Sequence, residues 1–162
     1  MKSYNFQKLL MKYVVIFLLI FGYNHDQGLA AQNKKQGLMQ QAEYTKKYNF
    51  TVDWFTDNIP TWEKVLHQFK GEPNIDYLEI GVLEGRSLIW TLDNILTHPT
   101  SKATCIDTFY EDKVKQRFRV NLKASGFSEK VTVITGSSQF ELKYLPIESF
   151  EIIYIDCSHE CG

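Results

Sequence analysis

Apolar and polar residues alternate along the chain in blocks whose period changes, and these blocks predict strands that alternate with helices. Between Pro60 and Gly71, apolar side chains recur at the spacing of one helix face: Trp62, Val65, Leu66 and Phe69. From there on, short apolar runs and amphipathic stretches take turns. The predicted strands cover 75–80, 103–107, 131–135 and 150–156, and the predicted helices cover 60–69, 86–96, 112–124 and 139–145. Such alternation predicts a parallel sheet with right-handed crossovers.

The first 31 residues follow a different pattern. Three lysines precede an uncharged apolar run at 13–23, and small residues follow at 28–31. This order is typical of a secretory signal peptide, while an uncleaved membrane anchor and a misplaced start site remain alternatives. The sequence therefore divides into a leader or anchor at 1–31, a polar linker at 32–50 and a folded domain at 51–162. The protein is exported or membrane-associated through 13–23 if that segment functions, and cytoplasmic otherwise.

Composition narrows the class of function. The chain has 162 residues, enough for one domain, and its formal net charge is −1. Without a basic face it has no electrostatic footprint for nucleic acid. Cys105 falls in a predicted buried strand and is expected in the core. Cys157 and Cys161 flank His159, but there is no second cluster of the kind that structural zinc needs, and a disulfide between them stays open.

A glycine turn follows the first predicted strand of the domain, in the segment EIGVLEGRS that begins at Glu79. Its glycines, Gly81 and Gly85, allow the backbone to approach a ligand closely. The spacing matches neither the dinucleotide fingerprint nor the P-loop. Because Glu79 would repel a pyrophosphate, the turn favours a ligand with positive charge or hydroxyl and amine donors, such as S-adenosylmethionine, over NAD.

Acidic residues lie at or near the ends of three predicted strands: Glu79, Asp107 and Asp156. The remaining strand ends in Gly136-Ser137-Ser138. In open parallel sheets, ligands bind outside the carboxyl ends of the strands. A single acid there is usually a helix cap, but three acids on one edge predict a site for a polar ligand.

Residues 75–159 resemble the first half of a class I S-adenosylmethionine-dependent methyltransferase. The signatures are EIGVLEGRS, IDTF and YIDCSH, and the group with the greatest similarity is the small-molecule and sugar O-methyltransferases. The resemblance implies a Rossmann-like α/β fold, with helices on both faces of a parallel sheet. It also implies a small hydroxylated acceptor and the transfer of a methyl group to its oxygen.

The resemblance assigns roles by position. Glu79, Gly81 and Gly85 would lie beside the methionine and ribose portions of the cofactor, and Asp107 would accept hydrogen bonds from the ribose hydroxyls. Near the adenine it places Phe109, which is equally expected in the core, together with Ser137 and Ser138. Asp156 and His159 would activate the acceptor as general bases. In some related enzymes the residue that matches Asp156 instead binds a divalent cation, which makes Mg²⁺ a further expectation.

The resemblance ends at Gly162, after the first four strands of a seven-strand sheet. We therefore expect an incomplete sheet, with the strand at 150–156 as an apolar edge. One alternative is a catalytically inactive remnant that at most binds the cofactor. Another is a fragment of a nucleotide-binding dehydrogenase or epimerase, which the glycine spacing and Glu79 disfavour.

Overall fold

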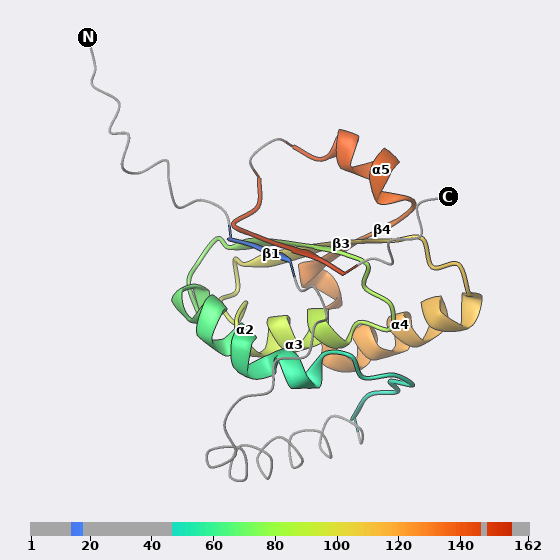
Figure 1. Cartoon of the computed structure of the whole chain (residues 1–162), viewed down its shortest axis with the longest axis horizontal. Coiled ribbons are helices and arrows are strands. Elements are labelled where there is room, and N and C mark those ends of the chain that lie inside the picture. Colours follow the sequence, from blue (N-terminus) through green and yellow to red (C-terminus); the bar gives the residue numbers. More distant parts are fainter. Residues whose placement is uncertain (1–13, 18–46, 147–148, 157–162) are drawn as a thin grey trace.

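A computed structural model describes residues 14–17, 47–146 and 149–156. In this part of the chain, five parallel strands form one sheet in the order β1-β5-β2-β3-β4 (Figure 1). The strands are β1 (Val14–Phe17), β2 (Asp76–Ile80), β3 (Lys102–Asp107), β4 (Val131–Thr135) and β5 (Ile152–Ile155). The four predicted strands are thus confirmed as β2, β3, β4 and β5.

The helices lie in two layers of unequal size. Those on one face of the sheet are α2 (Ile59–Leu66), α3 (Arg86–Asn94) and α4 (Asp112–Ser125), and α5 (Ser138–Glu141) lies on the other face (Figure 1). Short 3₁₀ turns extend this framework: η2 (Thr56–Asn58), η3 (His67–Phe69), η4 (Ser128–Lys130) and η5 (Leu142–Tyr144). Helices on both faces of a parallel sheet confirm the predicted Rossmann-like class.

The turn residues begin and end these helices as the sequence predicts. Pro60 lies in the first turn of α2, where its missing N–H leaves no bond unmade. Gly126 ends α4 in a left-handed conformation, with a φ of +85°. Val65 differs from its prediction, because its side chain is 37% exposed while Trp62 and Leu66 are fully buried. The apolar face of α2 is therefore narrower than the periodicity indicates.

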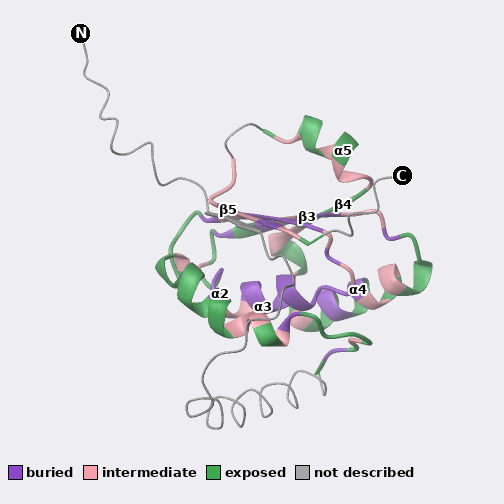
Figure 2. Ribbon diagram, in the orientation of Figure 1, coloured by how far each residue is buried: buried purple, intermediate pink, exposed green. Residues whose placement is uncertain are grey.

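The main core lies between the sheet and the α2–α3–α4 layer, where α3 is almost entirely buried (Figure 2). It contains Tyr77, Cys105 and Tyr154 from the strands and Trp62 and Trp90 from the helices. Cys105 is fully buried and unpaired, as expected for a core cysteine. A smaller apolar cluster lies on the opposite face, built from Leu78, Ile80 and Ile106.

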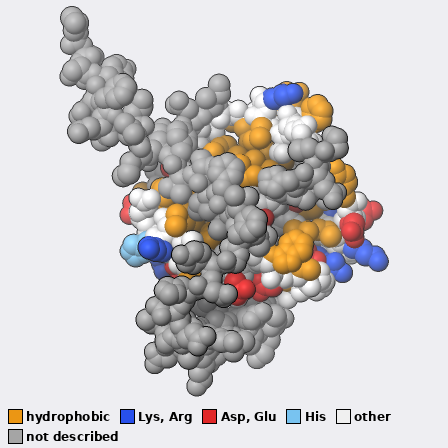
Figure 3. Space-filling model, in the orientation of Figure 1, with side chains coloured by type: hydrophobic (Ala, Val, Ile, Leu, Met, Phe, Trp, Pro, Cys, Tyr) orange, Lys and Arg blue, Asp and Glu red, His pale blue; other side chains and the backbone are white. Residues whose placement is uncertain are grey.

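The thinner face carries exposed apolar side chains. Phe140, Leu142 and Tyr144 on α5 and η5 are 41–82% exposed. Hydrophobic side chains gather in this upper region of the molecule (Figure 3). The larger cluster of buried apolar side chains therefore lies on the α2–α3–α4 side of the sheet.

One prediction about the sheet is wrong. The strand at 150–156, expected at the edge, lies between β2 and β1. Its partner β1 pairs Val14 with Ile152 and Phe17 with Ile155, and it comes from the apolar run assigned to a leader. Hydrophobic composition alone does not distinguish a leader from a strand of the sheet. No helix in the described ranges is long and apolar enough to cross a membrane.

Candidate functional site

A cavity of about 660 Å³ opens at the carboxyl ends of β2, β3 and β5. This volume lies within the range of small-molecule and cofactor sites. Of the residues predicted for a site, Gly81, Asp107, Phe109, Ser138 and Asp156 line it. The fold thus brings strand-end residues together from β2, β3 and β5, as the general rule for parallel sheets requires.

Asp107, at the carboxyl end of β3, holds two loops in place through hydrogen bonds to its carboxylate. Its Oδ2 accepts hydrogen bonds from the backbone N–H groups of Val82 and Leu83, at 2.8 and 2.9 Å. Its Oδ1 accepts one from the N–H of Phe109 at 2.7 Å. Leu83 and Phe109 both have positive φ, at +48° and +45°, which is uncommon for residues with a side chain. The carboxylate therefore stabilises strained backbone in the two loops that border the cavity.

The two glycines of the turn have different roles. Gly81, with a φ of +84°, lines the cavity. Gly85, with a φ of +88°, precedes the first residue of α3, and a Cβ there would lie 3.1 Å from the ring of Phe118. Gly81 permits close approach by a ligand, whereas Gly85 permits close packing of α3 against α4.

Glu79 does not line the cavity. It is fully buried on β2, where Ser87 Oγ donates to its Oε1 and Tyr77 Oη donates to its Oε2 at 2.6 Å. Burial raises the pKa of this carboxyl to about 8; the two hydroxyl donors oppose the rise, and the charges of Asp156 and Asp107 add to it. Glu79 is thus linked to the cavity through Ser87, which lines it.

Asp156 lies directly after β5 with its side chain exposed at the cavity. Its backbone N–H donates to the carbonyl of Ile80 at 2.8 Å, which fixes the strand end against β2. Tyr154 Oη donates to Asp156 Oδ2 at 2.7 Å. A carboxylate held at the mouth of a cavity can accept a proton or bind a cation.

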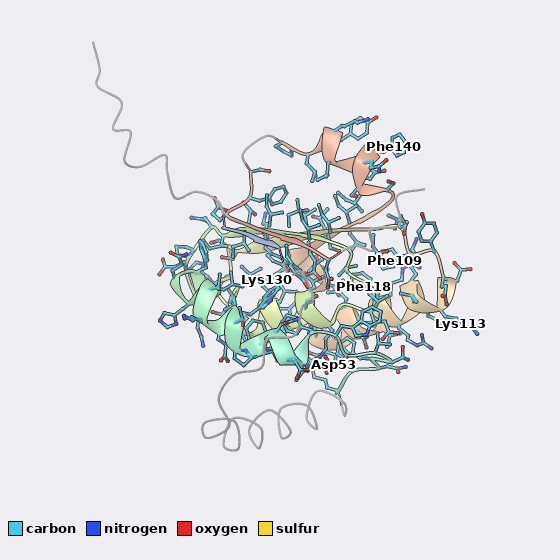
Figure 4. All side chains as sticks on the ribbon, in the orientation of Figure 1. Asp53, Phe109, Lys113, Phe118, Lys130 and Phe140 are labelled. Atoms are coloured by element: carbon cyan, nitrogen blue, oxygen red, sulfur yellow. The ribbon has the colours of Figure 1, made fainter. Side chains whose placement is uncertain are left out.

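The remaining predicted residues differ in how they relate to the cavity. Ser137 directly precedes α5, where its side chain makes no capping hydrogen bond, and it is not part of the cavity wall. The ring of Phe109 is buried against Phe118, 5.1 Å away between centroids, so it serves the core as well as the cavity (Figure 4). His159, Cys157 and Cys161 lie outside the described residues. Within those residues, no three His, Cys, Asp or Glu side chains are grouped to hold a metal ion.

Sequence reasoning missed a segment before α2 that also lines the cavity. Val52, Trp54 and Phe55 line it, and Trp54 is 68% exposed. The buried carboxylate of Glu84 accepts hydrogen bonds from the backbone N–H and the hydroxyl of Thr51, each at 2.6 Å. The one signal in the sequence for this contact was the position of Glu84, a charged residue between the glycines of the turn.

Two further contacts hold the same segment. Asn121 is fully buried in α4, and its side chain bonds both the N–H and the carbonyl of Asn49, at 2.7 and 3.2 Å. Arg86 donates to Thr56 Oγ1 at 2.7 Å and lies 3.6 Å from Asp53. Residues 48–56 are therefore joined to the glycine turn and to α4 by side chains that sequence patterns do not connect.

The chain is similar to known methyltransferases, both in sequence and in fold. A family model described as a methyltransferase domain matches residues 78–161. No curated protein matches the chain in sequence. The cofactor-bound protein Rv0187 from MTB has a similar fold, with 21% identity and a TM-score of 0.54 over 84% of this chain and 62% of that one.

Two further solved structures have the same fold. The SAH-bound methyltransferase PaMTH1 of Podospora anserina is 17% identical, with a TM-score of 0.55 over 85% of this chain and 62% of its own. The O-methyltransferase from Bacillus cereus, solved in complex with SAH, is 22% identical, with a TM-score of 0.50 over 78% of this chain and 54% of its own. The chain thus spans 54–62% of the length of these three proteins.

Proposed function

Since this chain belongs to the methyltransferase-domain family, we propose that its cavity binds S-adenosylmethionine and that the domain serves methyl transfer to the oxygen of a small hydroxylated acceptor. The observation that carries the proposal is the set of three strand-end acids. Asp107 and Asp156 line the cavity, and Glu79 is joined to it through Ser87. Two proteins of similar fold, from Bacillus cereus and Podospora anserina, have SAH bound, which supports the same cofactor class.

The residues at the cavity fit a cationic ligand that carries hydroxyl groups. Gly81 leaves the backbone open to close approach, and Asp107 offers carboxylate oxygens at the cavity wall. The carboxylates of Asp107 and Asp156 favour a sulfonium and an ammonium group over a pyrophosphate. A dehydrogenase or epimerase role is disfavoured for the same reason.

When bound, S-adenosylmethionine supplies a methyl group that the sulfonium already activates, so the protein contributes mainly by positioning. In this proposal Asp107 accepts hydrogen bonds from the ribose hydroxyls, and Gly81 and Ser138 shape the wall around the cofactor. Asp156 accepts the proton that the acceptor hydroxyl loses as its oxygen gains the methyl group. His159 is assigned to the same task by resemblance alone.

A magnesium-dependent variant of this chemistry does not fit the described residues. Asp156 has no second and third acidic or imidazole partner grouped with it in those ranges. A cation of this kind needs several oxygen ligands. The described residues around Asp156 therefore do not form a magnesium site.

The proposal is tested by calorimetric titration of the full chain with S-adenosylmethionine. We expect binding that Asp107→Asn weakens at least tenfold, about 1.4 kcal/mol, because the amide loses one acceptor oxygen and the negative charge. Asp76→Asn is the matched control, since Asp76 begins β2 at the amino ends of the strands, whereas the cavity lies at their carboxyl ends. A folded chain that does not bind the cofactor, or an Asp107→Asn variant with unchanged affinity, contradicts the proposal.

Methyl transfer is a separate question, because the chain spans little more than half the length of its structural relatives. It is measured with methyl-labelled S-adenosylmethionine and a panel of small phenols, catechols and sugars. Binding without transfer to any of them favours the alternative of a cofactor-binding remnant.

A further inference from the structure

The ring of Tyr154 is fixed in the core. Tyr154 is 2% exposed on β5, and its ring meets Trp62 edge to face, with centroids 4.7 Å apart and planes at 86°. Trp62 is itself fully buried and makes similar contacts with Phe55 and Trp90. Aromatic pairs in this geometry prefer one relative orientation. The phenol oxygen of Tyr154 therefore has a defined place at the end of a rigid ring.

That oxygen connects the core to the cavity. Tyr154 Oη donates to Asp156 Oδ2 at 2.7 Å, and Asp156 is exposed at the cavity two residues further on. Among the described residues, this is the hydrogen bond that the Asp156 carboxylate accepts. Asp107, by contrast, accepts three bonds from backbone N–H groups. The orientation of Asp156 thus depends on one side chain, whereas that of Asp107 depends on the backbone.

We propose that Tyr154 is a positioning residue, which holds the Asp156 carboxylate at the cavity in the orientation needed to accept the acceptor's proton. The inference rests on the proposed function for the role of Asp156, but the hydrogen bond and the buried ring stand independently of it. A fixed base avoids the loss of side-chain freedom that a mobile carboxylate would undergo at each turnover.

Tyr154 is suited to this task because it stays a donor. Burial raises the pKa of its hydroxyl, and the bond to Asp156 and the charges of Asp156 and Glu79 raise it further. At neutral pH the phenol therefore keeps its proton and cannot become a second anion beside the carboxylate. A phenylalanine would preserve the packing on Trp62 and remove only the donor.

The first test measures orientation and needs neither cofactor nor acceptor. The three-bond couplings that report χ1 of Asp156 are recorded by NMR in the full chain and in Tyr154→Phe. We expect a single rotamer in the parent chain and averaging in the variant. Tyr77→Phe is the matched control: it removes the equivalent hydroxyl from β2, whose partner is Glu79, and should leave the Asp156 couplings unchanged. A single Asp156 rotamer in Tyr154→Phe overturns the proposal.

The second test uses an acceptor that gives turnover with the parent chain. We expect Tyr154→Phe to lower kcat by ten- to a hundredfold while the KM for S-adenosylmethionine stays within twofold. An unchanged kcat overturns the proposal, as does a loss confined to KM. If the parent chain neither binds the cofactor nor transfers methyl groups, the proposed function fails, and the couplings still decide whether Tyr154 orients Asp156.

Discussion

The same pair of residues, a tyrosine followed two positions later by an acid, occurs on two neighbouring strands and serves two different environments. Tyr77 donates to Glu79 on β2, and Tyr154 donates to Asp156 on β5. The strands are parallel, and Glu79 stands opposite Tyr154 in their register. The β5 pair is thus shifted two residues toward the carboxyl ends of the strands, which is enough to bury the first acid completely and to expose the second at the cavity.

The difference shows what a hydrogen-bonded carboxyl can do in each place. Glu79 is surrounded by core residues, and burial raises its pKa to about 8, so it is mostly protonated at neutral pH. Asp156 has water on one side and a buried phenol on the other. The first pair resists ionisation and contributes to the stability of the fold, while the second presents an exposed carboxylate to the cavity.

The largest effect expected from the difference between the two pairs is a change of the free energy of unfolding with pH. Because the pKa of Glu79 is raised on folding from 4.5 to about 8, the folded chain holds a proton that the unfolded chain releases. Its contribution to stability is therefore complete below pH 4.5 and is lost as pH rises toward 8, by roughly 5 kcal/mol in total. Urea unfolding at several pH values should show that the free energy of unfolding falls as pH rises. In Glu79→Gln this dependence on pH should be much weaker.

Asp156→Asn is the control for that experiment. If the decline persists in Glu79→Gln and disappears in Asp156→Asn, the assignment of the two environments is reversed.

An intermediate effect on the free energy of unfolding is expected at Gly85, which precedes α3, the helix whose Ser87 donates to Glu79. Gly85→Ala should cost about 1–3 kcal/mol in free energy of unfolding, because φ is +88° and the new Cβ would lie 3.1 Å from Phe118. Gly126→Ala has the same kind of backbone, at +85°, but meets no atom within 4 Å. It should cost less, about 1 kcal/mol. Equal losses in the two variants would mean that backbone strain alone matters and that α3 is not tightly seated on α4.

The smallest expected effect is the difference between the two hydroxyl deletions. Tyr77→Phe leaves a buried carboxyl with one donor fewer and should cost about 1–3 kcal/mol. Tyr154→Phe leaves a carboxylate that water can reach and should cost less than about 1 kcal/mol. Both are measured by chemical denaturation at pH 7. A larger loss for Tyr154→Phe would show that this pair is chiefly structural.

Much of this architecture follows from the sequence. The strand at 131–135 has the bounds predicted for it, because its β-branched run is bordered by clear turn residues. The cavity at the strand ends follows from the parallel topology, so the grouping of Asp107 with Asp156 needed no structural information. These are features that local patterns and one topological rule determine.

Other features depend on contacts between distant segments. A tyrosine two residues before an acid looks like ordinary strand alternation, so neither Tyr77 nor Tyr154 stood out. Glu84 and Asn121 bond to residues 33 and 72 positions away, which no periodicity encodes. The partner of β5 was missed because the apolar residues at 14–17 have the same composition in a leader and in a strand.

The three bonds to Asp107 also limit how a ligand can use it. A carboxylate has about four acceptor positions, and backbone N–H groups from two loops occupy three of them. A ligand with one hydroxyl donor can use the position that is left. A vicinal diol brings two donors, so one amide must give way, and releasing Leu83 or Phe109 lets a residue with positive φ relax. Binding of a diol would then change the backbone conformation of one of these loops, whereas binding of a ligand with one hydroxyl would leave the loops as they are.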